Sequence, residues 1–366
     1  MELNVFKSFR FHPVLTNLNP PESTPGTIEP IYGMLVKSIL VRIHRPQTEG
    51  TMLKIVLLDG GTIGKVNNFK LIAKLGDLEM FDATEPDQVV ERCSGKDVVI
   101  VNKVEMDARV MKQLPDLKLI CVAATGVNNV DLNYAKNNGI EVKNVAGYST
   151  DSVAQLTFTM LLYLVNKPYY YDHYVKSGAY YRSGSFTHHG EPFWELKGKR
   201  MGIIGLGTIG RQVARIAESF GMEVVFYSTT GRNNHISYKR FDLDDLLKSS
   251  DVVTIHAPLN NRTRDLITYE KIKLMRPCAI LLNLGRGGII NERDLAKALN
   301  DNLIGAAGLD VLEHEPIKPD SPMLKLYDRE KILITPHMAW ASRESRELLV
   351  EKIARNIEMF ERDLTN

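Results

Sequence analysis

The sequence predicts an α/β protein with two doubly wound parallel sheets, in which one domain is inserted within the other. Short apolar runs alternate with helical patterns from Met52 onward, which is typical of parallel sheets covered by helices. A long helical pattern over residues 152–177, apolar nearly all round in its first half, divides these runs into two sets. The final amphipathic pattern, 342–362, can return to the first set, so the second set would lie inside the first domain.

The first set of apolar runs predicts four strands with helices between them. These strands lie near residues 53–59, 98–102, 118–123 and 141–145, and the helices lie near 66–75 and 107–113. The strands of the second set lie near 201–205, 223–228, 252–256, 279–284, 305–310 and 332–335. Its helices lie near 209–220, 242–249 and 291–300. We expect two Rossmann-like or flavodoxin-like domains, one of residues 52–150 plus 341–366 and the other of residues 151–340.

The first 51 residues differ from the rest of the chain. The run PPESTPG, which begins at Pro20, cannot form a helix or a strand, and its flanks lack sustained periodicity. The opening shows no cationic start followed by an apolar core, as a signal peptide would. We therefore expect residues 1–51 to be a disordered extension, with Met52 as an alternative start of the chain.

Composition and charge narrow the functional classes. The chain has 366 residues, 44% of them hydrophobic and 25% charged, which suits a soluble protein of two domains. A net charge of +2 gives no reason to expect nucleic acid or a membrane surface as a partner. No apolar run reaches the roughly 20 residues that are needed to span a bilayer.

The cysteines point to a reducing compartment. Cys93, Cys121 and Cys278 lie far apart in the sequence, and no cluster of His, Cys and Asp has metal-ligand spacing, so we expect no metal. Cys121 and Cys278 have apolar neighbours in the sequence, so we expect both to be buried and reduced. A cytoplasmic location fits these thiols best.

The stretch RMGIIGLGTIGRQVARIAESFGMEVVF, which begins at Arg200, is the most informative in the chain. An apolar run leads into Gly205-x-Gly207-x-x-Gly210, and an amphipathic helix and a second apolar run follow. Gly205 permits a tight turn, Gly207 lets backbone N–H groups approach a pyrophosphate, and Gly210 lets the helix pack closely on the sheet. The anion would lie at the helix N-terminus, where unpaired N–H groups favour negative charge. The stretch therefore predicts that residues 151–340 bind a dinucleotide.

The residues after the second strand of this unit bear on which dinucleotide binds. NAD sites usually place an acid there, about 20 residues past the glycines, to bond the ribose 2′-OH. Here Ser228, Thr229 and Arg232 follow the strand, with no acid among them. Hydroxyls with a guanidinium suit a 2′-phosphate, which an acid would repel. The other interpretation is a polar surface loop with an incidental arginine, and we favour NADP(H) over NAD(H).

Three further strand ends carry polar groups of chemical interest. In open α/β sheets, ligands bind outside the carboxyl ends of the strands. Arg286 follows the apolar run AILLN, and its guanidinium matches a carboxylate in two-point geometry. Asp310 ends the next run, and His337 ends the last one, where an imidazole with carboxylates nearby is suited to act as a general acid.

Several motifs together resemble the D-isomer-specific 2-hydroxyacid dehydrogenase family. The resemblance covers roughly residues 53–362, and within the family the chain looks most like the glycerate dehydrogenase and hydroxypyruvate (glyoxylate) reductase group. The motifs are GLGTIG, NLGRGGIINERDL, GLDVLEHEP and TPHMAWAS, with ATGVNNVDL at 124–132 and NVAGYSTDSVAQ at 144–155.

The resemblance implies roles for residues at the matching positions. Arg286 would bind the substrate carboxylate and polarise the keto oxygen, and His337 would protonate that oxygen as hydride arrives from the nicotinamide. Glu315 would bond the far imidazole nitrogen and keep the proton available near neutrality, while Glu313 is offset from that position and ranks below it. The substrate-binding residues would be Thr125, Gly126, Arg286 and Trp340. The cofactor-binding residues would be Gly205, Gly207, Thr208, Ile209, Gly210, Ser228, Thr229, Arg232, Pro258, Leu284 and Asp310, the last of them through the nicotinamide carboxamide.

The implied reaction is the NAD(P)H-dependent reduction of hydroxypyruvate or glyoxylate to D-glycerate or glycolate. Two alternatives stay open. One is the same chemistry on another 2-keto acid, such as 2-ketogluconate or a bulkier one. The other is a non-catalytic, NAD(H)-sensing protein similar to the corepressors of this fold, which the missing acid after the second strand disfavours.

The resemblance and one sequence feature also favour a homodimer. The apolar pattern over 152–165 and the aromatic residues that follow offer more apolar surface than a monomer needs, although core packing would also explain them. These aromatic residues are Tyr169, Tyr170, Tyr171, Tyr174, Tyr180 and Tyr181.

Overall fold

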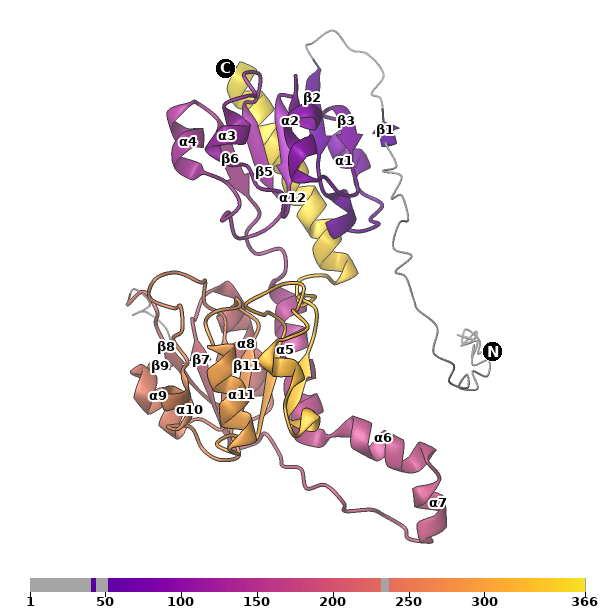
Figure 1. Cartoon of the computed structure of the whole chain (residues 1–366), viewed down its shortest axis with the longest axis vertical. Coiled ribbons are helices and arrows are strands. Elements are labelled where there is room, and N and C mark those ends of the chain that lie inside the picture. Colours follow the sequence, from indigo (N-terminus) through magenta and orange to yellow (C-terminus); the bar gives the residue numbers. More distant parts are fainter. Residues whose placement is uncertain (1–40, 44–51, 232–236, 366) are drawn as a thin grey trace, which may run out of the picture. The chain divides into compact units, whose positions relative to one another are not determined.

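The structure is a computed structural model that describes residues 41–43, 52–231 and 237–365. Its strands form two separate sheets (Figure 1). The first belongs to the N-terminal part of the described chain and the second to the middle part, and each corresponds to one of the two expected sets of strands. No helix within the described ranges is long and apolar enough to cross a membrane.

The first sheet has the strand order β1-β3-β2-β4-β5-β6. All its pairings are parallel except the one between β1 and β3. Its strands are β1 (Val41–Ile43), β2 (Leu53–Leu57), β3 (Gly76–Met80), β4 (Val98–Val101), β5 (Leu119–Val122) and β6 (Glu141–Asn144). Its helices are α1 (Lys70–Ala73), α2 (Val89–Cys93), α3 (Ala108–Met111) and α4 (Leu132–Asn137). The sequence predicts two of them, α1 and α3, and both are shorter than their predicted ranges. Short 3-10 turns occupy Gly60–Thr62 and Pro86–Gln88.

The second sheet has the order β13-β12-β11-β10-β7-β8-β9 and is parallel throughout. Its strands are β7 (Arg200–Ile204), β8 (Glu223–Tyr227), β9 (Lys239–Arg240), β10 (Val252–Ile255), β11 (Ile280–Asn283), β12 (Ala306–Leu309) and β13 (Ile332–Ile334). The helices around it are α5 (Thr150–Asn166), α8 (Thr208–Ser219), α9 (Leu243–Ser249), α10 (Tyr269–Ile272) and α11 (Glu292–Asn300), with 3-10 turns at Pro322–Leu324 and Arg329–Lys331.

Apolar cores cover both faces of each sheet. On the second sheet, one face carries a core from α9, α10 and α11, and the other carries a core from α5 and α8. The central strands β4, β5, β10 and β11 are buried along their whole length, because helices on both sides exclude water from a doubly wound sheet.

The C-terminal helix α12 (Arg343–Thr365) belongs to the first sheet. Leu349, Ile353 and Ile357 are fully buried in the same core as Ile55 of β2. Figure 1 shows this helix, in yellow, beside the strands of the first sheet. The chain therefore leaves the first domain, builds the second and returns, which confirms the expected fold class.

The long helix expected over 152–177 is wrong in one respect, because it is interrupted. The helix α5 ends at Asn166, Lys167 has a left-handed backbone with φ of 48°, and Pro168 begins α6 (Pro168–Lys176). Proline fits the first turn of a helix but disfavours helical geometry in the residue before it, so the break falls at Lys167. A further short helix, α7 (Ala179–Ser183), follows.

Three strands were not predicted, namely β1, β3 and the two-residue β9, and the expectations for Cys278 and for the N-terminal extension also need correction. Strand β3 (GDLEM) alternates with charged residues and pairs near the sheet edge, which weakens its apolar signal. Cys278 is exposed, contrary to the expectation, because it precedes β11 in a loop, whereas Cys121 is buried in β5. Of the expected disordered extension, Val41–Ile43 instead pair with β3, and the rest of residues 1–51 lies outside the described residues.

Candidate active site

The glycine turn between β7 and α8 has the geometry of an anion cradle. Gly205 has φ of 92°, and a Cβ there would lie 2.8 Å from the His256 carbonyl oxygen, so the position excludes other residues. A Cβ on Gly210 would lie 2.4 Å from the Gly205 carbonyl oxygen. At Gly207, by contrast, a Cβ would meet nothing within 4 Å, and no side chain caps the helix.

Open space therefore lies over the uncapped N-terminus of α8, which begins with Thr208 and Ile209. The first N–H groups of a helix lack partners within it, and a phosphate placed there would accept hydrogen bonds from them. The residues that form this turn fit a dinucleotide pyrophosphate.

The end of β8 lies beside a cavity of about 560 Å³. Ser228 is buried, and its Oγ accepts a hydrogen bond from the Gly231 N–H at 3.0 Å, so this hydroxyl shapes the turn after the strand. Arg232 lies outside the described residues. The cavity is lined by Thr229, Thr230, Asn260, Asn261 and Arg262.

Arg262 is not among the residues predicted from the sequence. The segment Asn260–Thr263 follows the carboxyl end of β10, whose neighbour β7 separates it from β8. Its turn is held by the Thr263 hydroxyl, which donates to the Pro258 carbonyl at 2.7 Å, and by the Asn260 carboxamide, which accepts the Arg262 N–H at 2.9 Å. The position of Arg262 in the loop after β10 could have indicated a binding role, because ligands bind at this edge of the sheet.

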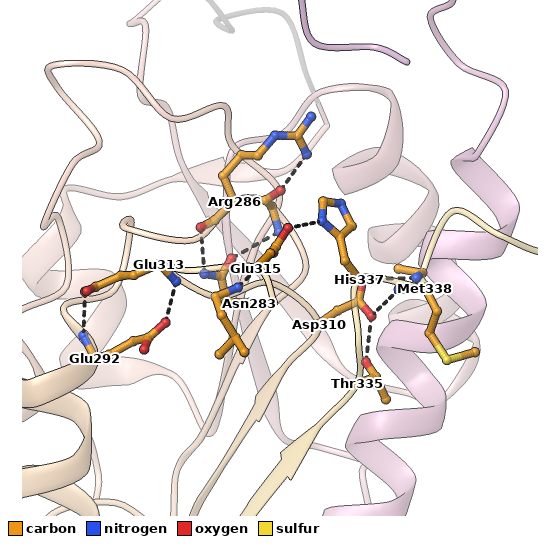
Figure 2. Close-up of polar contacts among 12 residues, drawn as sticks. Asn283, Arg286, Glu292, Asp310, Glu313, Glu315, Thr335, His337 and Met338 are labelled. Atoms are coloured by element: carbon orange, nitrogen blue, oxygen red, sulfur yellow. Dashed lines mark hydrogen bonds and ion pairs between the residues drawn. The ribbon is translucent and has the colours of Figure 1, made fainter. Parts of the chain in front are cut away.

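Asp310 is buried at the end of β12 and holds the segment that carries His337 (Figure 2). Its Oδ1 accepts hydrogen bonds from the Thr335 hydroxyl at 2.6 Å and the Met338 N–H at 2.9 Å, and its Oδ2 accepts from the Ala339 N–H at 2.9 Å. Burial raises the pKa of this carboxyl, and the three donors and nearby His337 offset only part of that rise. Asp310 therefore holds the backbone on both sides of His337 in place.

His337 has a left-handed backbone, with φ of 52°. Its N–H donates to the Asp310 carbonyl at 2.8 Å, and this bond helps to hold the unusual conformation. The Nδ1 atom lies 2.7 Å from Oε2 of Glu315. Because an ionised carboxylate only accepts hydrogen bonds, Nδ1 is the donor, and Nε2 is left to exchange a proton with a ligand.

Glu315 is held in the ionised form. Burial raises its pKa, but the hydrogen bonds from His337 and from the Leu312 N–H, with the charges of His337 and Lys103, outweigh burial and lower the pKa overall. Glu313 does not contact His337, since its carboxylate accepts instead from the Glu292 N–H at 3.1 Å.

Arg286 lies in the loop after β11, next to the Glu315–His337 pair in Figure 2. The buried Asn283 side chain shapes this loop by donating to the Arg286 carbonyl at 2.9 Å and accepting from the Gly285 N–H at 3.0 Å. The guanidinium donates from Nη1 to the Gly285 carbonyl at 2.9 Å, and this bond orients the two terminal nitrogens of the side chain. The predicted catalytic residues Arg286, Glu315 and His337 are therefore brought together at the carboxyl ends of adjacent strands.

The other predicted substrate residues are distributed as follows. A Cβ on Gly126 would lie 3.1 Å from Nη2 of Arg286, so the guanidinium reaches this backbone. Thr125 donates its hydroxyl to the Val145 carbonyl at 3.2 Å. The Trp340 ring packs edge-on against Tyr148, with 6.2 Å between the ring centroids. Of the cofactor residues, Pro258 is exposed and Leu284 is buried in the core that packs α5 and α8 against the sheet.

The chain is similar to known proteins over most of its length. Residues 158–339 match the family described as D-isomer specific 2-hydroxyacid dehydrogenase, NAD binding domain. A glycerate dehydrogenase from Methylorubrum extorquens is 36% identical over 308 residues, which cover 84% of this chain and 96% of that protein. A hydroxypyruvate reductase from Blautia hydrogenotrophica is 37% identical over 316 residues, with 84% and 97% covered. The chain belongs to the D-isomer specific 2-hydroxyacid dehydrogenases.

One solved structure with a similar fold contains a nicotinamide cofactor. The acyclic imino acid reductase Bsp5, in complex with NADPH and D-Arg, is 30% identical and has a TM-score of 0.75, with 85% of this chain and 97% of that chain covered. This dehydrogenase is accordingly an oxidoreductase whose second domain is its nicotinamide-cofactor domain. Within the described ranges, no group of three or more His, Cys, Asp and Glu side chains is arranged to hold a metal ion.

Proposed function

We propose that this dehydrogenase reduces hydroxypyruvate or glyoxylate to D-glycerate or glycolate, and that NADPH is its preferred cofactor. The observation that carries the proposal is the convergence of Arg286 with the Glu315–His337 pair, whose Nδ1–Oε2 distance is 2.7 Å. A 2-keto acid brings a carboxylate, which needs a fixed cation, and a carbonyl oxygen, which needs a proton. The names of the two relatives, glycerate dehydrogenase and hydroxypyruvate reductase, support the choice of a small substrate.

In the proposed reaction, each group has one task. The bound nicotinamide supplies the hydride that reaches the keto carbon. Arg286 holds the substrate carboxylate by two-point contact, aided by backbone N–H groups at Thr125 and Gly126. Nε2 of protonated His337 gives its proton to the keto oxygen, and Glu315 stabilises the imidazolium before transfer. Addition of this hydride to the keto carbon moves the carbonyl π electrons to the oxygen, and the proton from His337 completes the alcohol.

The preference for NADP(H) is supported by the charges at the end of β8. The residues from Ser228 to Gly231 include no acid that would repel a 2′-phosphate. The cavity there is lined by the hydroxyl or amide side chains of Thr229, Thr230, Asn260 and Asn261, and by the Arg262 side chain. We therefore add Arg262 to the cation Arg232 that the sequence indicated.

The test is the initial rate of hydroxypyruvate and glyoxylate reduction, measured in parallel with NADPH and with NADH. A higher kcat/KM with NADPH supports the whole proposal. Turnover that favours NADH would retain the reductase and reject the cofactor preference. Absence of turnover with either substrate, in protein that still binds nucleotide, would reject these substrates and lead to 2-ketogluconate and bulkier 2-keto acids.

We also propose a homodimer. The apolar helix α5 is explained by packing in the core of its own domain, so it gives no support. The following segment does, because α6 and α7 extend beyond the end of α5 (Figure 1) and none of their residues is buried. Tyr181 is 90% exposed and Phe186, just after α7, is 94% exposed, so two large aromatic side chains close together in the sequence face solvent. A cytoplasmic location, which fits the free thiols of Cys93 and Cys121, stays part of the proposal.

A further inference from the structure

Glu292 is a buried carboxylate outside the group that would contact substrate. It is the first residue of α11, and its exposed fraction is 7%. A glutamate is rarely buried without a specific partner. Figure 2 shows its side chain directed at the backbone of Glu313, on the loop that leads to Glu315.

Glu292 and Glu313 form two reciprocal hydrogen bonds. The Glu313 N–H donates to Oε1 of Glu292 at 2.5 Å, and the Glu292 N–H donates to Oε1 of Glu313 at 3.1 Å. The second bond satisfies an N–H group in the first turn of α11, which has no partner within the helix, and puts a negative charge where the helix dipole favours it. Each residue thus fixes the backbone of the other across 21 positions of sequence.

The short segment from Leu312 to Glu315 is also held by contacts other than this pair. Leu312 is buried in the core, and a Cβ on Gly287 would lie 1.8 Å from the Leu312 carbonyl oxygen, so the two backbones are in close contact. The Leu312 N–H donates to Oε1 of Glu315 at 3.0 Å. The other oxygen of Glu315 lies 2.7 Å from Nδ1 of His337. A continuous set of contacts therefore joins Glu292 to the imidazole.

We propose that Glu292 is a positioning residue for the acid–base pair: its carboxylate holds the Glu313 backbone, and thereby holds Glu315 within hydrogen-bond distance of His337. The inference rests on the proposed function, since it assigns a role to the same site. A displaced Glu315 would leave the imidazole free to turn, and small displacements of catalytic groups reduce rates steeply.

The charges around Glu292 decide which substitutions are informative. Burial raises the pKa of Glu292, the charges of Glu313 and Glu315 raise it further, and the Glu313 N–H and His314 oppose them. Glu292→Gln keeps an oxygen that accepts from the Glu313 N–H and removes one of three neighbouring negative charges. Glu292→Ala removes the acceptor, and Glu292→Asp keeps the charge on a side chain too short to reach.

The experiment compares these variants by the pH dependence of kcat for hydroxypyruvate reduction and by NADPH affinity from fluorescence titration. Glu292→Ala and Glu292→Asp should lower kcat by up to about 100-fold and shift the pH profile, with NADPH affinity unchanged. Glu292→Gln should stay within about threefold of the wild type. Glu270→Ala is the matched control, because Glu270 lies in the first turn of α10 at the surface, 3.1 Å from Lys273.

The role through Glu315 is tested by a double-mutant cycle. In a Glu315→Gln background, Glu292→Ala should cause little further loss of kcat, because the group it positions is already altered. A full additional loss, or an Ala variant that folds and retains the wild-type pH profile, would overturn the proposal. If Glu292→Ala does not fold, Glu292→Asp carries the test.

A substrate-free measurement separates this inference from the proposed function. The Nδ1 proton of His337, held by Glu315, should give a downfield proton resonance in the wild type and in Glu292→Gln, weakened or lost in Glu292→Asp. Absence of 2-keto acid turnover in the wild type would reject the function alone. An unchanged resonance in Glu292→Asp would reject the positioning role alone.

Discussion

Nδ1 of His337 lies 2.7 Å from Oε2 of Glu315, while Oε1 of the same carboxylate accepts a hydrogen bond from the Leu312 N–H at 3.0 Å. Both oxygens of Glu315 are therefore used, one for the backbone of its own loop and one for the imidazole. This arrangement fixes which imidazole nitrogen faces outward. It also places the imidazole against a carboxylate whose pKa is lowered by these hydrogen bonds.

Glu315→Gln should lower kcat for hydroxypyruvate reduction by about 10²-fold or more, because a neutral carboxamide cannot stabilise the imidazolium that donates the proton. NADPH affinity should stay near the wild-type value, since Glu315 lies away from the glycine turn. Stopped-flow measurement of hydride transfer checks the prediction. Glu270→Gln is the surface control. Retention of full activity in Glu315→Gln would show that the imidazole does not need the carboxylate.

The lowered pKa of Glu315 predicts a pH dependence of stability. A carboxyl group whose folded pKa is below its unfolded value stabilises the fold above the unfolded pKa, about 4.3 for glutamate, and that contribution is lost as pH falls through the folded value. The melting temperature of the wild type should exceed that of Glu315→Gln near neutral pH. The difference should shrink below about pH 4, and a constant difference across that range would contradict the assignment.

Arg262→Ala should weaken NADPH binding by about tenfold or more and leave NADH binding nearly unchanged, because only the former carries a 2′-phosphate. Calorimetric titration with 2′,5′-ADP and with 5′-ADP isolates this phosphate from the nicotinamide. Arg355→Ala, on the exposed face of α12, is the control for loss of one positive charge. Equal losses for both nucleotides would remove Arg262 from the 2′-phosphate site.

Arg286→Lys should lower kcat/KM for hydroxypyruvate by about 10²-fold, although the charge is retained, because an ammonium cannot form the two-point contact of a guanidinium. The loss should appear mainly in KM, since the substrate carboxylate is bound before and during the reaction. An unchanged KM would show that a residue other than Arg286 binds the substrate carboxylate.

Two glycines of the turn should behave differently when changed to alanine. At Gly207 a Cβ meets nothing within 4 Å, so Gly207→Ala should retain the wild-type melting temperature and lose nucleotide affinity by filling the cradle. At Gly210 a Cβ would lie 2.4 Å from the Gly205 carbonyl oxygen, so Gly210→Ala should lower the melting temperature. Thermal melting with and without NADPH distinguishes the two, and identical behaviour would contradict the geometry of the turn.

The homodimer predicts a mass in solution of twice the 41.3 kDa of one chain, measured by light scattering during gel filtration. The paired substitution Tyr181→Ser with Phe186→Ser should lower that mass toward the monomer, because both side chains are almost fully exposed in the single chain. A monomeric wild type would reject the dimer.

The sequence alone determined those features whose signal is local. The glycine turn, the succession of strands and the polar residues at their ends could be predicted because each depends on a few consecutive residues and on the 2-residue or 3.6-residue period of their neighbours. The C-terminal helix could be assigned to the first domain because its apolar face needed a core. The interruption at Lys167 also has a local signal, because Pro168 disfavours helical geometry in the residue before it.

Only the tertiary structure decided which distant residues meet. Arg262 lies beside Thr229 because β10 and β8 are neighbours of the same strand, β7, and the sequence does not state strand order. The reciprocal bonds of Glu292 and Glu313, and the burial of Glu292, likewise depend on how α11 meets the end of β12. Contacts of this kind arise from packing across the sheet edge, where the energy comes from burial and geometry and leaves no period in the chain.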